Sequence, residues 1–128
     1  MPADAGDLAR DYYRTIDEGA YGELRDLLAD AFVQRRPDRT LEGADRFVRF
    51  MREERPETDT THVVERVYRA DPRDDGDGAS GPIGDVDADR YVAVEGRLER
   101  ANGEQWFRFV DTFAVVDGRL ATLRTYTM

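Results

Sequence analysis

The segment EQWFRFVDTFAVVDGRLATLRTY, residues 104–126, decides the fold class of this chain. It contains two strand-like runs, separated by an Asp117-Gly118 dipeptide of the kind that closes tight hairpins. Alternation places Phe107, Phe109, Asp111, Phe113 and Val115 in a row on one face of the first strand. A carboxylate in the middle of a hydrophobic face costs free energy unless neighbouring groups compensate it. Asp111 is therefore the first candidate for a functional residue.

The rest of the chain contains helices first and further strands later. Runs rich in β-branched and aromatic residues predict strands, and apolar residues at helical spacing predict helices. The strands are expected at residues 31–37, 61–70, 90–101, 104–116 and 119–127, and the helices at residues 6–18, 21–30 and 42–56. Asp4 and Asp7 are candidate caps for the first helix, and Gly19 ends it. This order predicts an α+β fold, with three N-terminal helices packed in the concave face of a curved, mainly antiparallel sheet.

The length and the residue types limit the class of protein. A chain of 128 residues predicts a single domain over 1–128, in which residues 71–89 form an exposed acidic loop. The absence of cysteine excludes disulfides, thiolate zinc sites and cysteine nucleophiles. His62 is the single histidine, which excludes a multi-histidine metal site. We therefore expect no metal and no nucleotide cofactor.

The net charge and the hydropathy of the sequence make nucleic acids and membranes unexpected partners. The net charge is -9, and every basic residue apart from His62 is arginine. An acidic surface repels phosphates, so binding of DNA or RNA is not expected. No apolar run reaches membrane-spanning length, and residues 1–13 lack the features of a secretory signal, so we expect a cytoplasmic protein without a membrane partner. The excess of carboxylates predicts a halophilic source, with codon bias towards arginine as the alternative.

The two faces of the predicted sheet suggest different roles. Three helices cannot completely fill the concave face, so we expect a pocket for a small molecule there. The opposite face mixes polar and apolar side chains and suits a homodimer interface better than bare solvent. Its members are Tyr91, Glu95, Arg97, Trp106, Arg108, Val110, Thr112, Ala114 and Val116.

Three segments together resemble a known group of proteins. They are YYRTIDEGAYGELRDLLADAFVQRRP (residues 12–37), LEGADRFVRFM (residues 41–51) and FVDTFAVVDGRLATLRTY (residues 109–126). In order and spacing they are similar to the nuclear transport factor 2-like (NTF2-like) superfamily, in its SnoaL-like (polyketide cyclase-like) and ketosteroid isomerase-like branches. The resemblance implies a cone of three helices wrapped by a curved sheet, usually a homodimer, with an apolar pocket inside.

The resemblance also implies a role for Asp111. This residue stands where ketosteroid isomerases place the carboxylic acid of the oxyanion hole, which apolar surroundings keep neutral. Aromatic neighbours would desolvate Asp111 in the same way, raise its pKa and let it act as an acid. The tyrosine of that oxyanion hole corresponds to Tyr12, with Tyr13 as the neighbouring candidate. The catalytic base of the isomerases corresponds to Arg36, which cannot abstract a proton at ordinary pH, so their isomerisation mechanism is not expected here.

Two functions from different classes remain open at this stage. In the first, the protein is a cofactor-independent enzyme of the cyclase, isomerase or hydrolase type, which acts on a small, largely apolar carbonyl compound. Asp111 and Tyr12 are then the catalytic residues. In the second, it is a non-catalytic ligand-binding or dimerisation module, and Asp111 pairs with Arg36 or orients a ligand. The residues expected to contact a ligand are Tyr13, Gln34, Arg36, Phe50, Phe109, Phe113 and Leu123. His62 is expected to be exposed at the start of its strand.

Overall fold

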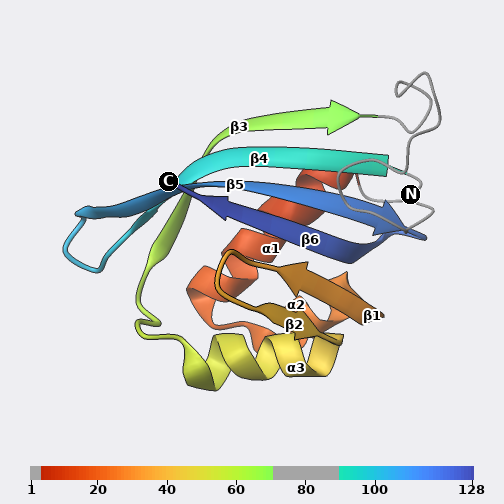
Figure 1. Cartoon of the computed structure of the whole chain (residues 1–128), viewed down its shortest axis with the longest axis horizontal. Helices are drawn as coiled ribbons and strands as arrows, with labels where there is room; N and C mark the ends of the chain where they lie inside the picture. Colours follow the sequence, from red (N-terminus) through yellow and green to blue (C-terminus); the bar gives the residue numbers. More distant parts are fainter. Residues whose placement is uncertain (1–3, 71–89) are drawn as a thin grey trace.

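The structure is built from three helices and one six-stranded sheet (Figure 1). The computed structural model describes residues 4–70 and 90–128, and the acidic loop predicted at 71–89 lies outside this part. The helices are α1 (Ala5–Glu18), α2 (Tyr21–Leu27) and α3 (Ala44–Arg49), and a π-helical turn, η1 (Phe50–Glu54), continues the third. The strands are β1 (Leu28–Arg35), β2 (Thr40–Glu42), β3 (Thr61–Ala70), β4 (Arg90–Glu99), β5 (Gln105–Val116) and β6 (Arg119–Thr127).

The sheet is curved and mixed, with strand order β2-β1-β6-β5-β4-β3. All neighbouring strands are antiparallel except β1 and β6, which run parallel. Helix α1 packs against β3 and β4, and α3 packs against β1. The predicted α+β fold, with three helices packed against a curved sheet, is confirmed. In the described part of the chain, no helix is long and apolar enough to cross a membrane.

Helix α1 has the boundaries that its sequence predicts. The side chain of Asp4 accepts a hydrogen bond of 2.7 Å from the backbone N–H of Gly6, which satisfies one of the free donors of the first turn. Gly19 ends the helix in the left-handed region at φ 69°, where a residue without a Cβ is favoured. One face of the helix is buried against the sheet, so its tyrosines Tyr12 and Tyr13 point inward.

The apolar row of β5 faces the helices, as alternation predicts. Phe109, Asp111 and Phe113 are 3%, 5% and 0% exposed. The register places Asp111 between Val94 of β4 and Thr125 of β6. The carboxyl group therefore lies on the concave side of the sheet, beneath helix α1.

Several element boundaries differ from the sequence prediction, and two of them show the physical reason. The second helix was predicted to run to Asp30, but it ends at Leu27, because Leu28 is fully buried and pairs with Leu120 as the first residue of β1. The third helix was predicted from Glu42, but residues 40–42 form the short strand β2, which pairs with β1. In both places, pairing and burial override the local helical pattern.

Gly96 allows β3 and β5 to approach β4 closely. A Cβ atom at this position would lie 2.4 Å from the carbonyl oxygen of Val63 and 2.8 Å from Cζ of Phe109. Both distances are shorter than a van der Waals contact. The Val63 oxygen belongs to the backbone, so it cannot move aside as a flexible side chain could. The missing side chain of Gly96 therefore makes room for the Phe109 ring and lets the sheet curve.

We expect Gly96→Ala to destabilise the protein by about 1–3 kcal/mol, since the added methyl group overpacks the sheet. Urea unfolding followed by circular dichroism measures this change. Gly22→Ala is the matched control, because nothing lies within 4 Å of its added Cβ and the residue is helical. That variant should be as stable as the original protein or more stable. Equal stability of the two variants would contradict the packing argument.

Candidate functional site

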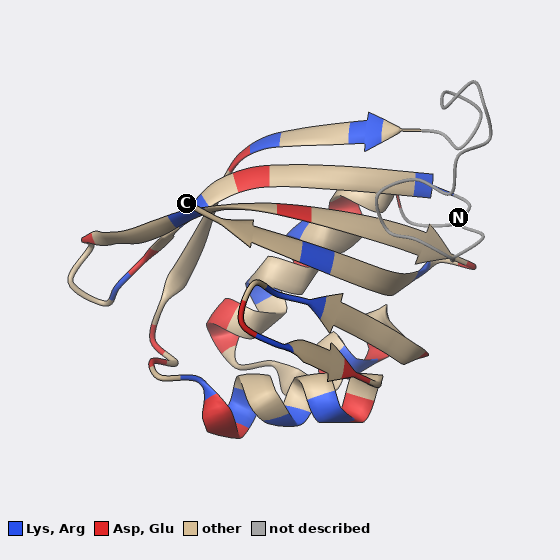
Figure 2. Cartoon of the chain, viewed as in Figure 1, with Lys and Arg blue, Asp and Glu red and all other residues tan. Residues whose placement is uncertain are grey.

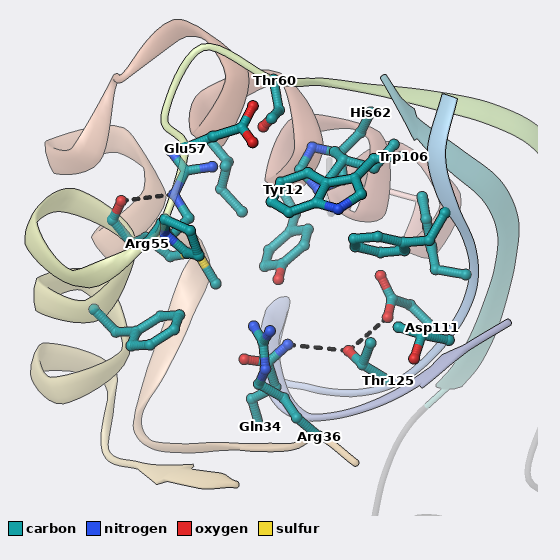
Figure 3. Close-up of a pocket in the computed structure, with 18 residues that line it drawn as sticks. Tyr12, Gln34, Arg36, Arg55, Glu57, Thr60, His62, Trp106, Asp111 and Thr125 are labelled. Atoms are coloured by element: carbon teal, nitrogen blue, oxygen red, sulfur yellow. Dashed lines mark hydrogen bonds between the residues drawn. The ribbon is translucent and has the colours of Figure 1, made fainter. Parts of the chain in front are cut away.

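A cavity of about 190 Å³ opens on the concave side of the sheet, between the strands and the helical layer (Figure 3). Its walls are mainly apolar and aromatic. They include Ile16, Phe50, Met51, Leu98, Phe107 and Phe109. Polar and charged side chains reach the same space from several elements. They are Tyr12, Gln34, Arg36, Arg55, Glu57, Thr60, His62, Asp111, Thr125 and Thr127.

Asp111 is held by hydroxyl groups on both sides of its carboxyl group. Tyr13 on α1 donates a hydrogen bond of 2.7 Å to Oδ2, and Thr125 on β6 donates one of 2.6 Å to Oδ1. Nε2 of Gln34 on β1 donates in turn to Oγ1 of Thr125 at 3.0 Å. Figure 3 shows the part of this chain that runs from Gln34 through Thr125 to Asp111. The network fixes the position of the carboxyl group, because donors from α1 and β6 bind it and Gln34 on β1 holds one of these donors in place.

Burial raises the pKa of Asp111 above the ordinary value of 3.8. The two hydroxyl donors, Thr125 and Tyr13, lower the pKa, as do the imidazole of His62 when it is protonated and the charge of Arg36. Desolvation is the largest effect, because the carboxyl group lies among aromatic rings with only 5% of the residue exposed. The environment therefore stabilises the neutral acid relative to a carboxyl group in water, and a neutral acid can donate a proton or a hydrogen bond.

The two adjacent tyrosines of α1 have different roles. Tyr12 lines the cavity, and in Figure 3 its hydroxyl group points into the space between Asp111 and Arg36. Tyr13 does not line this cavity, because its hydroxyl group is directed at Asp111. Burial, followed by the charge of Asp111, raises the pKa of both tyrosines well above the usual value of 10.0. Both side chains therefore stay protonated at neutral pH and act as hydrogen-bond donors.

His62 is a cavity residue that the sequence analysis misplaced. The sequence predicted an exposed side chain, but the His62 side chain is only 16% exposed. It lies on the inner face of β3, opposite Leu98. Asp17 of α1 binds it twice: Oδ2 accepts from the backbone N–H of His62 at 2.9 Å, and Oδ1 lies 2.6 Å from Nδ1. A carboxylate only accepts hydrogen bonds, so this contact places the proton of a neutral imidazole on Nδ1. Nε2 then carries the free lone pair.

Arg36 does not form the ion pair with Asp111 that was one alternative from the sequence. Its Nε lies 3.3 Å from Oδ1 of Asp38, in the turn between β1 and β2. The guanidinium group also lies over the ring of Phe50, at 5.3 Å from the ring centre. Arg36 reaches the cavity as predicted, but its salt-bridge partner within the described residues is Asp38.

The remaining candidate residues divide into two groups. Gln34, Phe50 and Phe109 line the cavity, as the sequence analysis expects of ligand-binding residues. Phe113 and Leu123 do not reach it, because they are fully buried as a cross-strand pair in the core. Their alternation was predicted correctly, but they lie further along the sheet than the cavity.

Trp106 was assigned to the outer face of the sheet, yet it lines the cavity. The register between β4 and β5 shifts at this point: Leu98 pairs with Phe107, whereas Glu99 pairs with Gln105. Trp106 is the extra residue of this bulge, so it escapes the alternation that governs the rest of β5. The guanidinium group of Arg100 lies 4.6 Å from the Trp106 ring centre, and Arg100 also pairs with Glu57 at 3.4 Å.

Two buried polar atoms at the cavity have no hydrogen-bond partner among the described residues. They are Oε1 of Gln34 and Oγ1 of Thr60, whose residues are 3% and 2% exposed. Buried polar atoms are normally paired in folded proteins. A bound ligand or water with polar groups would supply the missing partners.

The family of the chain follows from comparison with known proteins. The family model of the SnoaL-like domain matches residues 9–123 of this chain. The chain belongs to the SnoaL-like domain family. No curated protein matches the sequence.

Solved structures of several bacterial proteins share the fold of this SnoaL-like protein. A proposed ketosteroid isomerase from Kribbella flavida is 23% identical, with a TM-score of 0.72 over 95% of this chain and 76% of its own. An NTF2-like protein of unknown function from Cytophaga hutchinsonii is 13% identical, with a TM-score of 0.71 over 100% of this chain and 93% of its own. A proposed polyketide cyclase from Sinorhizobium meliloti is 16% identical, with a TM-score of 0.63 over 94% of each chain. At these identities the likeness shows the fold alone.

Replacing Asp111 by Asn should change how stability depends on pH. A raised folded-state pKa means that Asp111 contributes stability below its unfolded-state pKa, and this contribution is lost as pH rises through the folded-state pKa. The free energy of unfolding of Asp111→Asn, minus that of the original protein, should therefore grow across this window. The growth amounts to about 1.4 kcal/mol for each pKa unit of the shift. Urea unfolding at a series of pH values measures it.

Asp30→Asn is the control for this series. The pKa of the exposed Asp30 is lowered by its hydrogen bond with Arg25, so its removal should not produce a difference that grows with pH. A stability difference for Asp111→Asn that shrinks with rising pH would show that the carboxylate, not the acid, is the favoured form.

Proposed function

We propose that this SnoaL-like protein is a cofactor-independent acid-base enzyme that acts on a small, largely apolar carbonyl compound. The observation that carries the proposal is that an oriented imidazole, a buried tyrosine hydroxyl group and a buried carboxyl group line one cavity. Asp111 is the acid, as expected from the sequence. His62 replaces the base that the isomerase pattern lacks at Arg36.

The chemistry that fits these groups begins with proton abstraction from the carbon next to a carbonyl group. Nε2 of His62 takes the proton, and the electron pair of the C–H bond moves into the carbonyl oxygen. The Tyr12 hydroxyl group has no hydrogen-bond partner among the described residues, so it is free to donate to that oxygen. In an unsaturated ketone, Asp111 then protonates the far carbon of the resulting dienolate, which completes a double-bond isomerisation, and the proton on His62 returns to Asp111 by way of solvent.

The role of Asp17 is to position the base. Its carboxylate accepts hydrogen bonds from both the backbone N–H and the ring of His62. These two contacts fix the orientation and the tautomer of the imidazole. The imidazole also packs against the rings of Tyr13 and Phe109, at 5.1 Å and 5.7 Å between ring centres. A base held in this way loses little freedom when the substrate binds.

The test is hydrogen–deuterium exchange at the carbon next to a ketone. Cyclic ketones of one or two rings are incubated with the protein in D2O, and NMR follows the loss of the α-proton signals. We expect exchange faster than in buffer, and a decrease of about 10²–10⁴-fold in His62→Gln, the range that a general base contributes. Asp17→Asn should retain the base but disturb its tautomer, so its rate should fall between the two.

Tyr68→Phe is the control variant, because Tyr68 is exposed and bonds to Glu95 away from the cavity. It should exchange the ketone protons at the original rate. Ketone binding without any exchange would contradict the enzymatic proposal and support the alternative, a non-catalytic ligand-binding module. Exchange that His62→Gln leaves unchanged would contradict the assignment of the base.

A further inference from the structure

We infer that the cavity has a carboxylate-binding end at Arg36, so that the ligand is a small organic acid with a largely apolar body. The inference rests on the proposed function, since it defines the substrate class of the same cavity. Arg36 follows β1 directly, and its backbone N–H donates to the carbonyl oxygen of Arg39 at 2.8 Å, which closes the turn to β2. Its side chain is 28% exposed and lines the cavity.

The charges around Arg36 leave one positive charge without compensation. Asp38 is shared by two guanidinium groups: its Oδ1 lies 3.3 Å from Nε of Arg36, and its Oδ2 lies 3.3 Å from Nε of Arg39. Figure 2 shows this turn as basic segments around one acidic residue. Neither terminal nitrogen of Arg36 has a hydrogen-bond partner among the described residues. The N–H groups that normally bind a carboxylate are therefore free.

The other charged side chains of the cavity already have hydrogen-bond or salt-bridge partners. Nε of Arg55 donates to the carbonyl oxygen of Met51 at 2.8 Å, and Nη2 donates to the hydroxyl oxygen of Tyr21 at 3.3 Å. Glu57 pairs with Arg100. Both carboxyl oxygens of Asp111 already accept hydrogen bonds, from Tyr13 and Thr125. Among the residues that the structure describes, Arg36 therefore presents two free terminal nitrogens to this cavity, whereas one terminal nitrogen of Arg55 is already used, and the partner that suits the free pair is an anion.

The surroundings of Arg36 favour a planar anion joined to an apolar body. The contact with Phe50 holds the guanidinium group against an aromatic wall, which limits its rotation. The Tyr12 hydroxyl group lies close enough that the charges of Arg36 and Arg55 both lower its pKa, against the larger effect of burial. A bound molecule would place its carboxylate on Arg36 and its carbonyl oxygen at Tyr12. Its hydrocarbon part would then lie against the aromatic walls.

Two matched probes test this inference: cyclohexanecarboxylate and its neutral analogue, cyclohexanecarboxamide. NMR titrations of the original protein should show that the carboxylate binds at least about tenfold more tightly, because a charge-assisted hydrogen bond is stronger than a neutral one. Arg36→Gln should abolish the preference while it keeps the affinity for the amide. Arg36→Lys should keep part of the preference, since it retains the charge without the planar fork.

Arg39→Gln is the matched control, because Arg39 shares Asp38 and lies over Phe50 at 5.0 Å but does not line the cavity. It should retain the full preference for the carboxylate. Equal affinity of the original protein for the two probes, or an equal loss in both glutamine variants, would overturn the inference. Ketone exchange without a carboxylate preference would overturn this inference alone, whereas a carboxylate preference without exchange would overturn only the proposed catalysis.

Discussion

The central constraint on this site is the burial of the Asp111 carboxyl group, which is almost completely removed from water. Desolvation of Asp111 would be costly for the anion, and the protein offsets part of this cost with hydroxyl donors from α1 and β6. A third element, β1, supports the second donor through Gln34. The compensation is incomplete, so the pKa of Asp111 stays raised. The same geometry that makes the site costly for the anion makes it suitable for acid catalysis.

Helix α1 connects the separate parts of the site. Tyr12 faces the cavity, Tyr13 holds Asp111, and Asp17 holds His62. Residues four apart on a helix share a face, so the spacing of Tyr13 and Asp17 brings the imidazole next to the ring that anchors Asp111. The proposed acid, Asp111, and the proposed base, His62, are therefore both held by side chains of one helix. Glu57, which lines the cavity, is not held by α1 but pairs with Arg100.

Strand alternation and turn residues were sufficient to predict the concave row of β5 and the inward position of Asp111. They failed where a residue's place depends on a distant partner. The contact of His62 with Asp17 joins residues 45 positions apart, and no local pattern signals it. Trp106 lies at the cavity and not on the predicted outer face, because a bulge interrupts the alternation of β5. Leu28 lies in β1 and not in the predicted helix, because it pairs with Leu120. The pairing of Asp38 with Arg36 could have been predicted from the sequence, since the two residues lie two positions apart in one turn.

The protonation state of Asp111 tests the account most directly. In a carbon-detected NMR titration of the free protein, the carboxyl carbon of Asp111 should report a pKa above the ordinary value of 3.8. Tyr13→Phe should raise the pKa further, because the variant removes a donor that favours the anion. A carboxyl group that titrates at or below the ordinary value would mean that hydrogen bonds outweigh desolvation. That result would contradict the account of Asp111 as a carboxyl group whose acid form is stabilised by burial.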